Sequence, residues 1–427
     1  MSEFPVAVIG AGVVGLCCAL ALRRRGVDVL LIDRGGPGEG CSFGNGGMIQ
    51  TGSSLPIGVP GLAGKIPRMI FDPEGPLSLR WRHLPSLLPW GVRFLANCSA
   101  SAARRNENLL ADLLKEALSS WRNLTNNTPA AAVFRQRGEL YVVRSQSALE
   151  ALRSKIEACE RHGVVVETLD ATSVRRYEPQ LAPTYQFGLY LPESAFVTDP
   201  LLLSQRIFEN FCAVGGRFER GEVLRILRCG SKAKVVLQSQ RELFASKVIV
   251  AAGAQSARLV AASGAKRLPI EPLRGYHVLM PHLKTPLAGP VIEGEMNIAI
   301  TPMLSGNRIA GTIEFAGQDA PPNWQRANML VPMAKNMVPG LSGEVLSRWV
   351  GDRPGTPDSL PIVGPLEPDG PIWLSCGHGT LGLTLAARTS LLLADALLGD
   401  LASTATMKPF LPTRFSGRVV EQRKDEA

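Results

Sequence analysis

The sequence predicts an α/β protein of two or three domains, one of which contains a doubly wound parallel sheet. The chain has 427 residues, which exceeds the roughly 100–200 residues of one typical domain. Residues 5–33 form, in order, an apolar strand, a glycine-rich turn, a helix and a second apolar strand. Two later apolar runs, 247–254 and 372–377, end in small residues, as buried parallel strands beside a ligand do.

The composition excludes several classes of protein. Hydrophobic residues make up 45% of the chain and charged residues 19%, which excludes a disordered chain. The net charge is +9, but the longest basic run is Arg23–Arg25, so we expect no nucleic-acid partner. The eight cysteines form no C-x-x-C pair and no cluster with metal-ligand spacing. The sequence therefore predicts free thiols and no metal site.

An apolar stretch near the start of the chain, 6–22, has features of a targeting segment. A signal peptide carries its positive charge before the apolar run, whereas the arginines here follow it and Glu3 precedes it. The stretch is also shorter than the about 20 apolar residues of a spanning helix, and three glycines interrupt it. We therefore expect a cytoplasmic protein without a transmembrane span.

The glycine-rich turn is a G-x-G-x-x-G motif at 10–15. It follows a strand expected over 5–9 and begins a helix expected over 12–25. In that context each glycine has a role: Gly10 permits the tight turn, Gly12 lets the backbone approach a pyrophosphate, and Gly15 lets the helix pack on the strand. The motif therefore predicts a dinucleotide at the N-terminus of the helix.

The next strand, expected over 27–32, ends at an acidic residue. Asp33 lies 23 positions after Gly10, where an acid accepts hydrogen bonds from a ribose diol. Arg34 is expected to grip a phosphate or to pack on the adenine. The dinucleotide is NAD or FAD, and the motif alone does not distinguish them.

A second glycine-marked turn, near the other end of the chain, favours FAD. The strand 372–377 runs into 378–384, and a long apolar helix follows to Leu398. The N-terminus of that helix can hold the negative charge of a reduced flavin. A polar glycine-rich loop at 41–48 follows the first motif closely. One long ligand that contacts both turns is the simplest explanation.

At this point a resemblance becomes specific. The chain resembles the FAD-dependent D-amino acid oxidase superfamily, and most closely its D-amino acid dehydrogenase branch. The motifs appear in the order and spacing of that family, from about residue 5 to residue 403. They are VAVIGAGVVGLCCALALRRRG (6–26), CSFGNGGM (41–48), AAGAQS (251–256), PLRGYHVLM (272–280), DRPGTPDSLPIVG (352–364) and GHGTLGLT (377–384).

The resemblance implies a Rossmann-like FAD domain built from discontinuous segments and an α+β substrate domain with an antiparallel sheet. The expected FAD domain comprises 1–50, 146–183, 199–262 and 350–404. The expected substrate domain comprises 51–145, 184–198 and 263–349, with a C-terminal tail at 405–427. The residues expected to bind FAD are Gly10, Gly12, Val13, Val14, Gly15, Asp33, Arg34, Ser42, Asn45, Gly46, Gly47, Met48, Val223, Ala251, Ala252, Gly253, Gly379, Thr380, Leu381 and Gly382.

The resemblance also implies a reaction. Hydride passes from the carbon beside an amine to flavin N5, and the resulting imine is hydrolysed to a keto acid and an amine. Related sarcosine oxidases attach FAD through a cysteine in the segment that matches 349–358. That segment has neither Cys nor His here, so we expect non-covalent FAD. The electron acceptor is oxygen, a quinone or a partner protein.

Arg353 carries the substrate argument. An arginine grips a carboxylate with two parallel hydrogen bonds and stays charged when it is desolvated. Arg353 matches the substrate-carboxylate arginine of the family; the alternative is an ion pair with Asp352 or Asp358 that stabilises a turn. Met48 and Thr380 are expected to line the same substrate site.

Two further residues are candidates for the catalytic site. Tyr276 either lines the pocket or is packed with its hydroxyl bonded elsewhere. His378 lies in the second turn and is expected to steady the flavin or the substrate. It is not expected to act as a general base, because the reaction needs none if the amine arrives neutral.

The apolar segment 81–95 mixes Trp, Leu and Arg, a composition typical of a membrane interface. It is either a peripheral membrane contact or a helix packed on the substrate domain. Alternatives for the whole protein also remain open. The same chemistry on a secondary amine such as iminodiacetate, sarcosine or D-proline is one, and a non-catalytic flavoprotein subunit is another. A flavin domain acting on RNA is a third, suggested by the charge alone.

Overall fold

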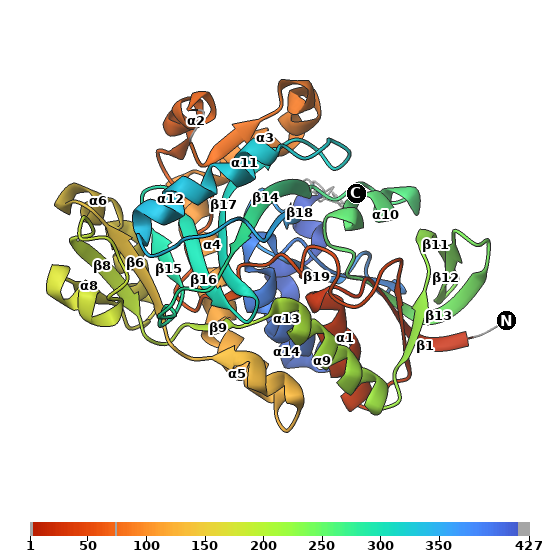
Figure 1. Cartoon of the computed structure of the whole chain (residues 1–427). Helices are drawn as coiled ribbons and strands as arrows, with labels where there is room; N and C mark the ends of the chain where they lie inside the picture. The colour runs from red at the N-terminus through yellow and green to blue at the C-terminus, as the bar shows by residue number, and fades with distance from the viewer. Residues whose placement is uncertain (1–2, 73–74, 417–427) are drawn as a thin grey trace, which may run out of the picture.

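The computed structural model describes residues 3–72 and 75–416, and they form two large sheets side by side (Figure 1). The first sheet has eight strands. Its centre consists of five parallel strands in the order β10, β2, β1, β13, β20. They span Arg217–Arg220, Val29–Asp33, Glu3–Ile9, Glu242–Val250 and Ile372–Cys376.

Helices α1 (Val13–Arg24) and α13 (Gly382–Leu397) pack side by side on one face of this sheet. The other face packs on α10 (Ser256–Ala262) and on the strands β11 (Val223–Cys229) and β12 (Lys232–Leu237). Because both faces are covered, β2, the later part of β1 and the end of β13 are continuous apolar runs rather than alternating ones, whereas the edge strand β10 is polar. The doubly wound α/β fold that the sequence predicts is confirmed.

The second sheet has nine strands, and most of its pairs are antiparallel. Helices α11 (Trp324–Asn328) and α12 (Leu330–Met337) cover one face. Helices α2 (Leu62–Phe71) and α3 (Leu84–Asn97) lie at its upper edge in Figure 1. In sheet order the strands are β18 (Ser347–Gly355), β14 (Glu271–Met280), β17 (Gly306–Phe315), β16 (Ile298–Met303), β15 (Val291–Glu293), β6 (Glu139–Val143), β8 (Phe187–Leu191) and β7 (Glu167–Leu169), and β4 (Leu77–Leu79) pairs with β17.

A β-bulge interrupts the pairing of β14 with β17. Arg274 pairs with Glu314 and Tyr276 pairs with Gly311, so β17 contains one residue more than β14 between these two pairs. Thr312 lies in the bulge and has a φ of 64°. This is the left-handed region, which a β-branched residue rarely adopts.

A three-stranded sheet of β3 (Met48–Ile49), β9 (Ala195–Val197) and β5 (Phe134–Arg135) lies between the two large sheets. The other elements are α4 (Ala100–Lys115), α5 (Ala117–Thr125), α6 (Gln146–Ala151), α7 (Arg153–Arg161), α8 (Ala171–Tyr177), α9 (Pro200–Ala213), β11 (Val223–Cys229), β12 (Lys232–Leu237), α10 (Ser256–Ala262), β19 (Ile362–Pro365) and α14 (Leu401–Met407).

Three of the expected domain bounds are wrong. The segment 146–183 belongs to the second sheet, because its strand β7 pairs with β8. A boundary at residue 350 divides β18, which pairs with β14 along its whole length. Within 51–145, α5 packs on the first domain, where Trp121 Nε1 donates to the carbonyl of Leu383 at 2.9 Å. A sequence that is read locally does not show which distant strand or helix an element contacts.

The expected tail also begins too early. Met407 and Phe410 are buried in the core that α1 and α13 share, and Arg414 pairs with Asp358 at 2.7 Å. These contacts hold residues 405–416 against the first domain, and 417–427 lie outside the described residues. One helical stretch, Gly379–Leu397, meets the length and hydropathy of a membrane span. Because 67% of its most apolar window is buried inside the protein, it fits a core helix.

Candidate active site

The glycine motif forms the tight turn that the sequence predicts. Gly10 has a φ of 108°, and a Cβ added there would lie 2.4 Å from the carbonyl oxygen of Ala251. A Cβ at Gly15 would lie 1.8 Å from the carbonyl oxygen of Gly10. At Gly12 the nearest atom to such a Cβ is Ser42 Oγ, at 3.3 Å. Gly10 and Gly15 therefore allow close packing, and Gly12 leaves the backbone accessible to a ligand.

The start of α1 is held by side chains from two loops. Val13 N donates to Ser42 Oγ at 2.9 Å. The Asp33 carboxylate accepts from Ala11 N at 2.6 Å and from Gly35 N at 2.8 Å. These bonds fix Asp33 at the end of β2, beside the turn where a ribose would lie.

Arg34 and Val223 lie near the same end of the sheet. Arg34 is exposed and pairs with Glu222, with a distance of 3.7 Å between Nη1 and Oε1. Val223 begins β11, two residues after Gly221, whose N–H donates to the carbonyl of Asp33 at 2.8 Å. Both residues remain predicted contacts of the adenosine half.

The carboxyl end of β13 also leaves its backbone accessible to a ligand. Ala251 N donates to the carbonyl of Ile9 at 2.8 Å, so Ala251 and Ala252 follow directly on the central strands. Gly253 has a φ of 56°, and a Cβ there would meet nothing within 4 Å. Small residues at this position keep the strand end clear for a ligand.

The loop 41–48 is fastened to the second sheet. Arg308 donates to the carbonyls of Phe43 and Asn45, at 2.9 and 2.6 Å. Thr301 Oγ1 donates to the carbonyl of Gly46 at 2.9 Å, and Asn45 Oδ1 accepts from Gly47 N at 2.8 Å. Arg308 is buried, and its role was not predicted from the sequence. Arg308 therefore connects the loop 41–48, which we call the cofactor loop, to the second sheet, which we call the substrate sheet.

His378 precedes the second glycine turn and is buried. Its Nε2 lies 3.0 Å from Thr389 Oγ1 on α13. Burial lowers the pKa of His378 to about 4, so its ring is neutral at physiological pH. Residues Gly379–Leu381 form a short 3₁₀ turn, α13 begins at Gly382, and a Cβ at Gly379 would meet nothing within 4 Å. The helix thus starts from an open backbone turn.

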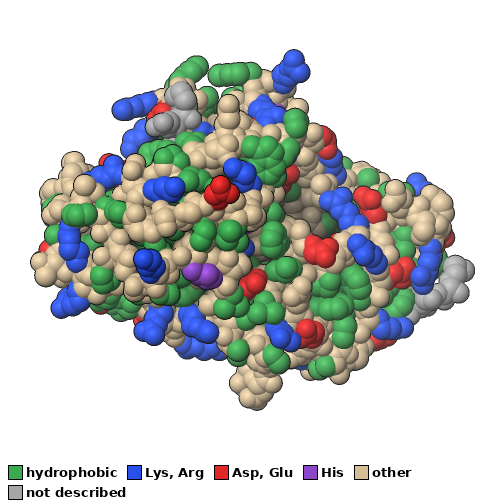
Figure 2. Space-filling model, in the orientation of Figure 1, with side chains coloured by type: hydrophobic (Ala, Val, Ile, Leu, Met, Phe, Trp, Pro, Cys, Tyr) green, Lys and Arg blue, Asp and Glu red, His purple; other side chains and the backbone are tan. Residues whose placement is uncertain are grey.

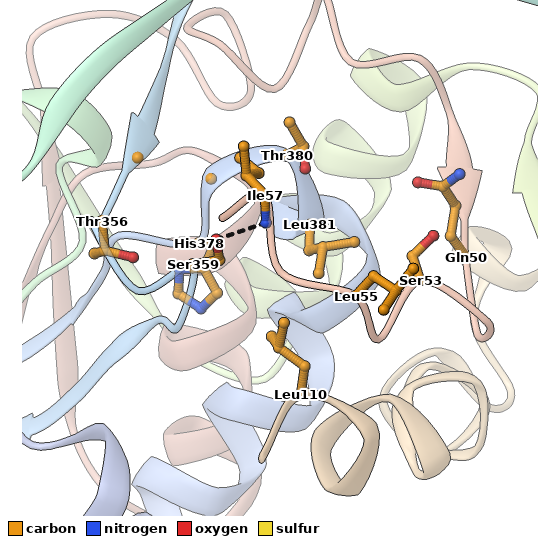
Figure 3. Close-up of a pocket in the computed structure, with 12 residues that line it drawn as sticks. Gln50, Ser53, Leu55, Ile57, Leu110, Thr356, Ser359, His378, Thr380 and Leu381 are labelled. Carbon is orange, nitrogen blue, oxygen red and sulfur yellow. Dashed lines mark hydrogen bonds between the residues drawn. The ribbon is translucent and has the colours of Figure 1, made fainter. Parts of the chain in front are cut away.

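A small cavity of about 150 Å³ lies against this turn. Figure 3 shows its residues coming from the loop 50–57, the turn 378–381, the segment 356–359 and Leu110 of α4. Ile57 N donates to Ser359 Oγ at 3.0 Å and joins two of these segments. The contact holds the loop 50–57 against the segment 356–359.

A second cavity, of about 710 Å³, extends from the cofactor loop to the substrate sheet and to α2 and α3. Met48, Thr380 and Arg353, which the sequence analysis expects at the substrate site, all line it. Its further lining residues are Asn45, Gly46, Gln50, Ser53, Ile57, Leu62, Ile66, Met69, Ile70, Pro76, Leu77, Leu79, Leu84, Leu87, Leu88, Trp90, Gly91, Val92, Phe94, Leu95, Tyr141, Leu273, Ile292, Asn297, Ala299, Ala310, Gly311, Thr312, Ile313 and Phe315.

Arg353 has no carboxylate partner among the described residues. Its Nη1 reaches the carbonyl of Thr312 at 3.5 Å, whereas the neighbouring Asp352 pairs with Arg274 at 3.0 Å. Asp358 pairs with Arg414 instead. The two acids that could have explained Arg353 as a turn residue are therefore occupied by other arginines. Burial lowers the pKa of Arg353, but a guanidinium remains charged at neutral pH.

Tyr276 does not line this cavity, so its predicted site role is wrong. Its ring belongs to the core cluster under α11 and α12, and its hydroxyl donates to Glu314 Oε2 at 2.5 Å. The same hydroxyl accepts from Asn323 N at 2.9 Å, and burial raises the pKa of Tyr276 to about 12. Successive residues of a strand point to opposite faces, and the next residue, His277, points toward the cofactor loop. His277 Nδ1 lies 3.1 Å from the carbonyl of Gly44.

Two features near Arg353 could not be found from the sequence. Thr312 lines the cavity, and its buried Oγ1 has no hydrogen-bond partner among the described residues. Cys41 lies near Arg353, yet burial raises the pKa of its thiol to about 11. Thr312 reaches the site through a bulge, and a bulge depends on the register of two strands.

The comparisons with known proteins agree with this geometry. The model of the FAD dependent oxidoreductase family matches residues 5–396. The chain belongs to this family. A D-amino-acid oxidase of Bradyrhizobium diazoefficiens is 33% identical over 96% of the chain and 98% of that protein. A D-amino acid dehydrogenase of Rhizobium johnstonii is 30% identical over 92% of the chain and 96% of that protein.

A solved structure supports the fold. Glycine oxidase from Geobacillus kaustophilus superposes with a TM-score of 0.74 at 22% identity and covers 97% of this chain and 99% of that one. The flavoenzyme described here is thus an FAD-dependent oxidoreductase that acts on amino acids or amines. Its residues fit that cofactor, because Thr380 of the second turn lines both cavities, Asn45 and Gly46 of the loop 41–48 line the larger one, and Ser42 of the same loop holds the start of α1.

Proposed function

We propose that the flavoenzyme oxidises the C–N bond of a D-amino acid whose carboxylate Arg353 holds. The observation that carries this proposal is the guanidinium of Arg353, which pairs with no carboxylate among the described residues and lies in a cavity whose other described lining residues are uncharged. An arginine without an acid partner is costly to bury, and a bound carboxylate supplies that partner with two parallel hydrogen bonds. The curated relatives named above act on D-amino acids by their names, which supports this stereochemistry.

Bound FAD would supply the hydride acceptor, and the imine that leaves the cavity is hydrolysed by water to a keto acid and ammonia. The residues of the chain hold the substrate in position. Arg353 fixes the substrate at one end, and Met48 and Thr380 border the same cavity on the cofactor side. Apolar walls exclude water, so the substrate amine loses its proton before it enters. The neutral His378 supports the turn and takes no proton from the substrate.

We also propose that FAD is bound without a covalent link. Cys41 is the nearest thiol that the structure places beside Arg353, and it is held in its unreactive protonated form by burial. Acid precipitation of the purified protein tests this. The yellow colour is expected in the supernatant, and colour that stays with the pellet would contradict non-covalent binding.

The second half-reaction needs an acceptor, and we propose a quinone at a membrane surface. Helix α3 and the turn before it expose Trp81, Leu88, Val92 and Leu95 to solvent. Figure 2 shows hydrophobic side chains together with Lys and Arg side chains over α2 and α3, at the top of the molecule. Apolar side chains flanked by cations suit the interface of an anionic bilayer.

Anaerobic mixing with a panel of substrates tests the proposed function. The panel contains both enantiomers of several amino acids, with glycine, sarcosine, D-proline and iminodiacetate as secondary-amine and small-substrate arms. We expect D-amino acids to bleach the flavin absorbance and their L-enantiomers to leave it. Bleaching by the secondary amines alone would show that the substrate is a secondary amine. A flavin that no compound of the panel bleaches would indicate a non-catalytic subunit. Reoxidation by air or by a soluble quinone then identifies the acceptor.

A further inference from the structure

The described residues that line the large cavity include one charged residue. Arg353 alone among them carries a formal charge, and most of the rest are aliphatic or aromatic. Of the polar side chains, Asn45, Gln50, Ser53 and Thr380 belong to the cofactor side of the cavity, whereas Tyr141, Asn297 and Thr312 belong to the sheet side. The part of the cavity that a substrate side chain can occupy, beyond the cofactor loop, is therefore mainly apolar.

Two structural layers enclose this apolar part. One is the face of β16 and β17 that carries Ala299, Ala310 and Ile313. The other consists of α2 and α3, whose residues Ile66 and Leu87 pack with Phe315 on the buried Trp90. A flavin ring held beside Met48 and Thr380 would occupy one end of the 710 Å³ cavity and would leave the space under the two helices to the substrate.

Electrostatics restricts what can enter. A second ionised group on the substrate would lose its hydration and would find no countercharge among the described lining residues. Acidic and basic side chains are therefore disfavoured, as are dicarboxylates. A long aliphatic or aromatic side chain gains from burial, and each buried methylene adds to its affinity.

We infer that the substrate of this flavoenzyme is an amino acid with a large, uncharged, apolar side chain, which lies between α2–α3 and the β16–β17 face. This inference rests on the proposed amino acid oxidation and names its substrate class. The carboxylate binds Arg353 at one end of the cavity, and the side chain extends away from it toward the two helices.

The apolar space has one competing occupant. Leu88, Val92 and Leu95 line the cavity and are also exposed, so the space opens to the surface between the helices. A quinone tail could enter by the same opening. The substrate side chain is the better assignment, because the space is continuous with Arg353. Its guanidinium has no carboxylate partner among the described residues, and a quinone carries no carboxylate to supply one.

Anaerobic stopped-flow reduction of the holoenzyme tests the inference, since it isolates the amino acid from any acceptor. The probes are D-alanine, D-2-aminobutyrate, D-norvaline and D-norleucine, together with D-lysine and D-glutamate. We expect the second-order rate constant of reduction to rise about fourfold per added methylene, the equivalent of about 0.8 kcal/mol. D-lysine and D-glutamate should reduce the flavin at least about a hundredfold more slowly than D-norleucine.

A variant on the sheet face supplies a matched control. Ala310→Leu fills part of the apolar space, so it should slow reduction by D-norleucine at least tenfold more than it slows reduction by D-alanine. Bound flavin and an unchanged Tm show that the variant is folded. If Tm falls, Ile313→Thr replaces it, since this change shortens the side chain by one methyl group and makes the wall polar.

The outcomes separate the inference from the proposed function. Flavin that no amino acid reduces contradicts the proposed function itself. If D-alanine and D-norleucine reduce the flavin at equal rates, and Ala310→Leu changes neither rate, the inference is wrong while the proposed function still stands. If that variant instead slows reoxidation by a long-tailed quinone but not by a tail-less one, the space belongs to the acceptor. Faster reduction by D-lysine or D-glutamate also overturns the inference.

Discussion

Gly275 lies directly against the guanidinium of Arg353. A Cβ added at Gly275 would lie 2.3 Å from Cζ of Arg353 and from both of its terminal nitrogens. The two residues are neighbours on the paired strands β14 and β18, where Leu273 faces Arg353 and Gly275 faces Gly351. Gly275 thus provides the space in which the arginine lies, opposite the bulge that carries Thr312.

Gly275→Ala is therefore expected to displace the Arg353 side chain while the fold and the flavin remain. KM for the amino acid should rise at least tenfold, because a displaced guanidinium loses its paired hydrogen bonds to the carboxylate. Steady-state kinetics and the flavin spectrum check both parts. Gly340→Ala is the matched control, since its Cβ would make only an ordinary contact at 3.5 Å with Leu283.

Arg353→Lys keeps the charge but loses the planar fork. Removing one partner of a buried charged pair costs about 2–5 kcal/mol, and the lysine should recover part of that loss. We expect KM to increase in the order wild type, Arg353→Lys, Arg353→Ala, with flavin content unchanged. Equal KM values for the three proteins would show that the carboxylate binds elsewhere.

Thr312→Val tests the unpartnered hydroxyl in the bulge. Without substrate, Thr312 Oγ1 is buried and unbonded, so its removal should leave Tm unchanged or raise it. With substrate, we expect KM to rise about tenfold if this hydroxyl bonds the carboxylate that Arg353 holds. A lower Tm with an unchanged KM would mean that the hydroxyl serves the fold instead.

The buried histidine of the second turn makes stability depend on pH. The pKa of His378 is lowered to about 4 in the folded protein, below the ordinary value of about 6.5. The folded state thus binds fewer protons than the unfolded state between these values, and stability falls as pH decreases from about 6.5 to 4. Urea unfolding at pH 7 and pH 5 measures the loss, and His378→Gln should reduce it. An identical loss in the variant would place the titration at other groups, such as His277, whose pKa is lowered to about 3.

The proposed membrane contact predicts binding to anionic vesicles. Phe71→Ser with Trp81→Ser removes two exposed rings that lie 5.9 Å apart and do not line the large cavity. Co-sedimentation with phosphatidylglycerol vesicles should fall at least fivefold, while activity with a soluble acceptor stays the same. Leu401→Ser, an equally exposed change on α14, is the control and should bind as the wild type does.

The features that the sequence predicts correctly are local. Gly10, Gly15 and Asp33 act within one strand–helix–strand unit, so their spacing alone places them in the observed turn. Arg353 was found from its motif, and the structure adds that both nearby acids are paired elsewhere.

The features that the sequence misses depend on contacts between distant segments. Strand alternation puts Tyr276 and His277 on opposite faces, but no local signal says which face meets the cofactor loop. The bulge at Thr312 follows from the register of β14 against β17. The segment 146–183 joins the second sheet through a pairing with β8, which lies further along the chain.

The central claim is that the carboxylate grip of Arg353 makes an amine into a substrate. Anaerobic flavin reduction by D-norleucine and by 1-aminopentane, which lacks only the carboxylate, tests it most directly. The account predicts that the amino acid reduces the wild-type flavin at least about a hundredfold faster, and that this advantage disappears in Arg353→Ala. Equal rates for the two compounds in the wild type, or an advantage that survives in Arg353→Ala, would contradict it.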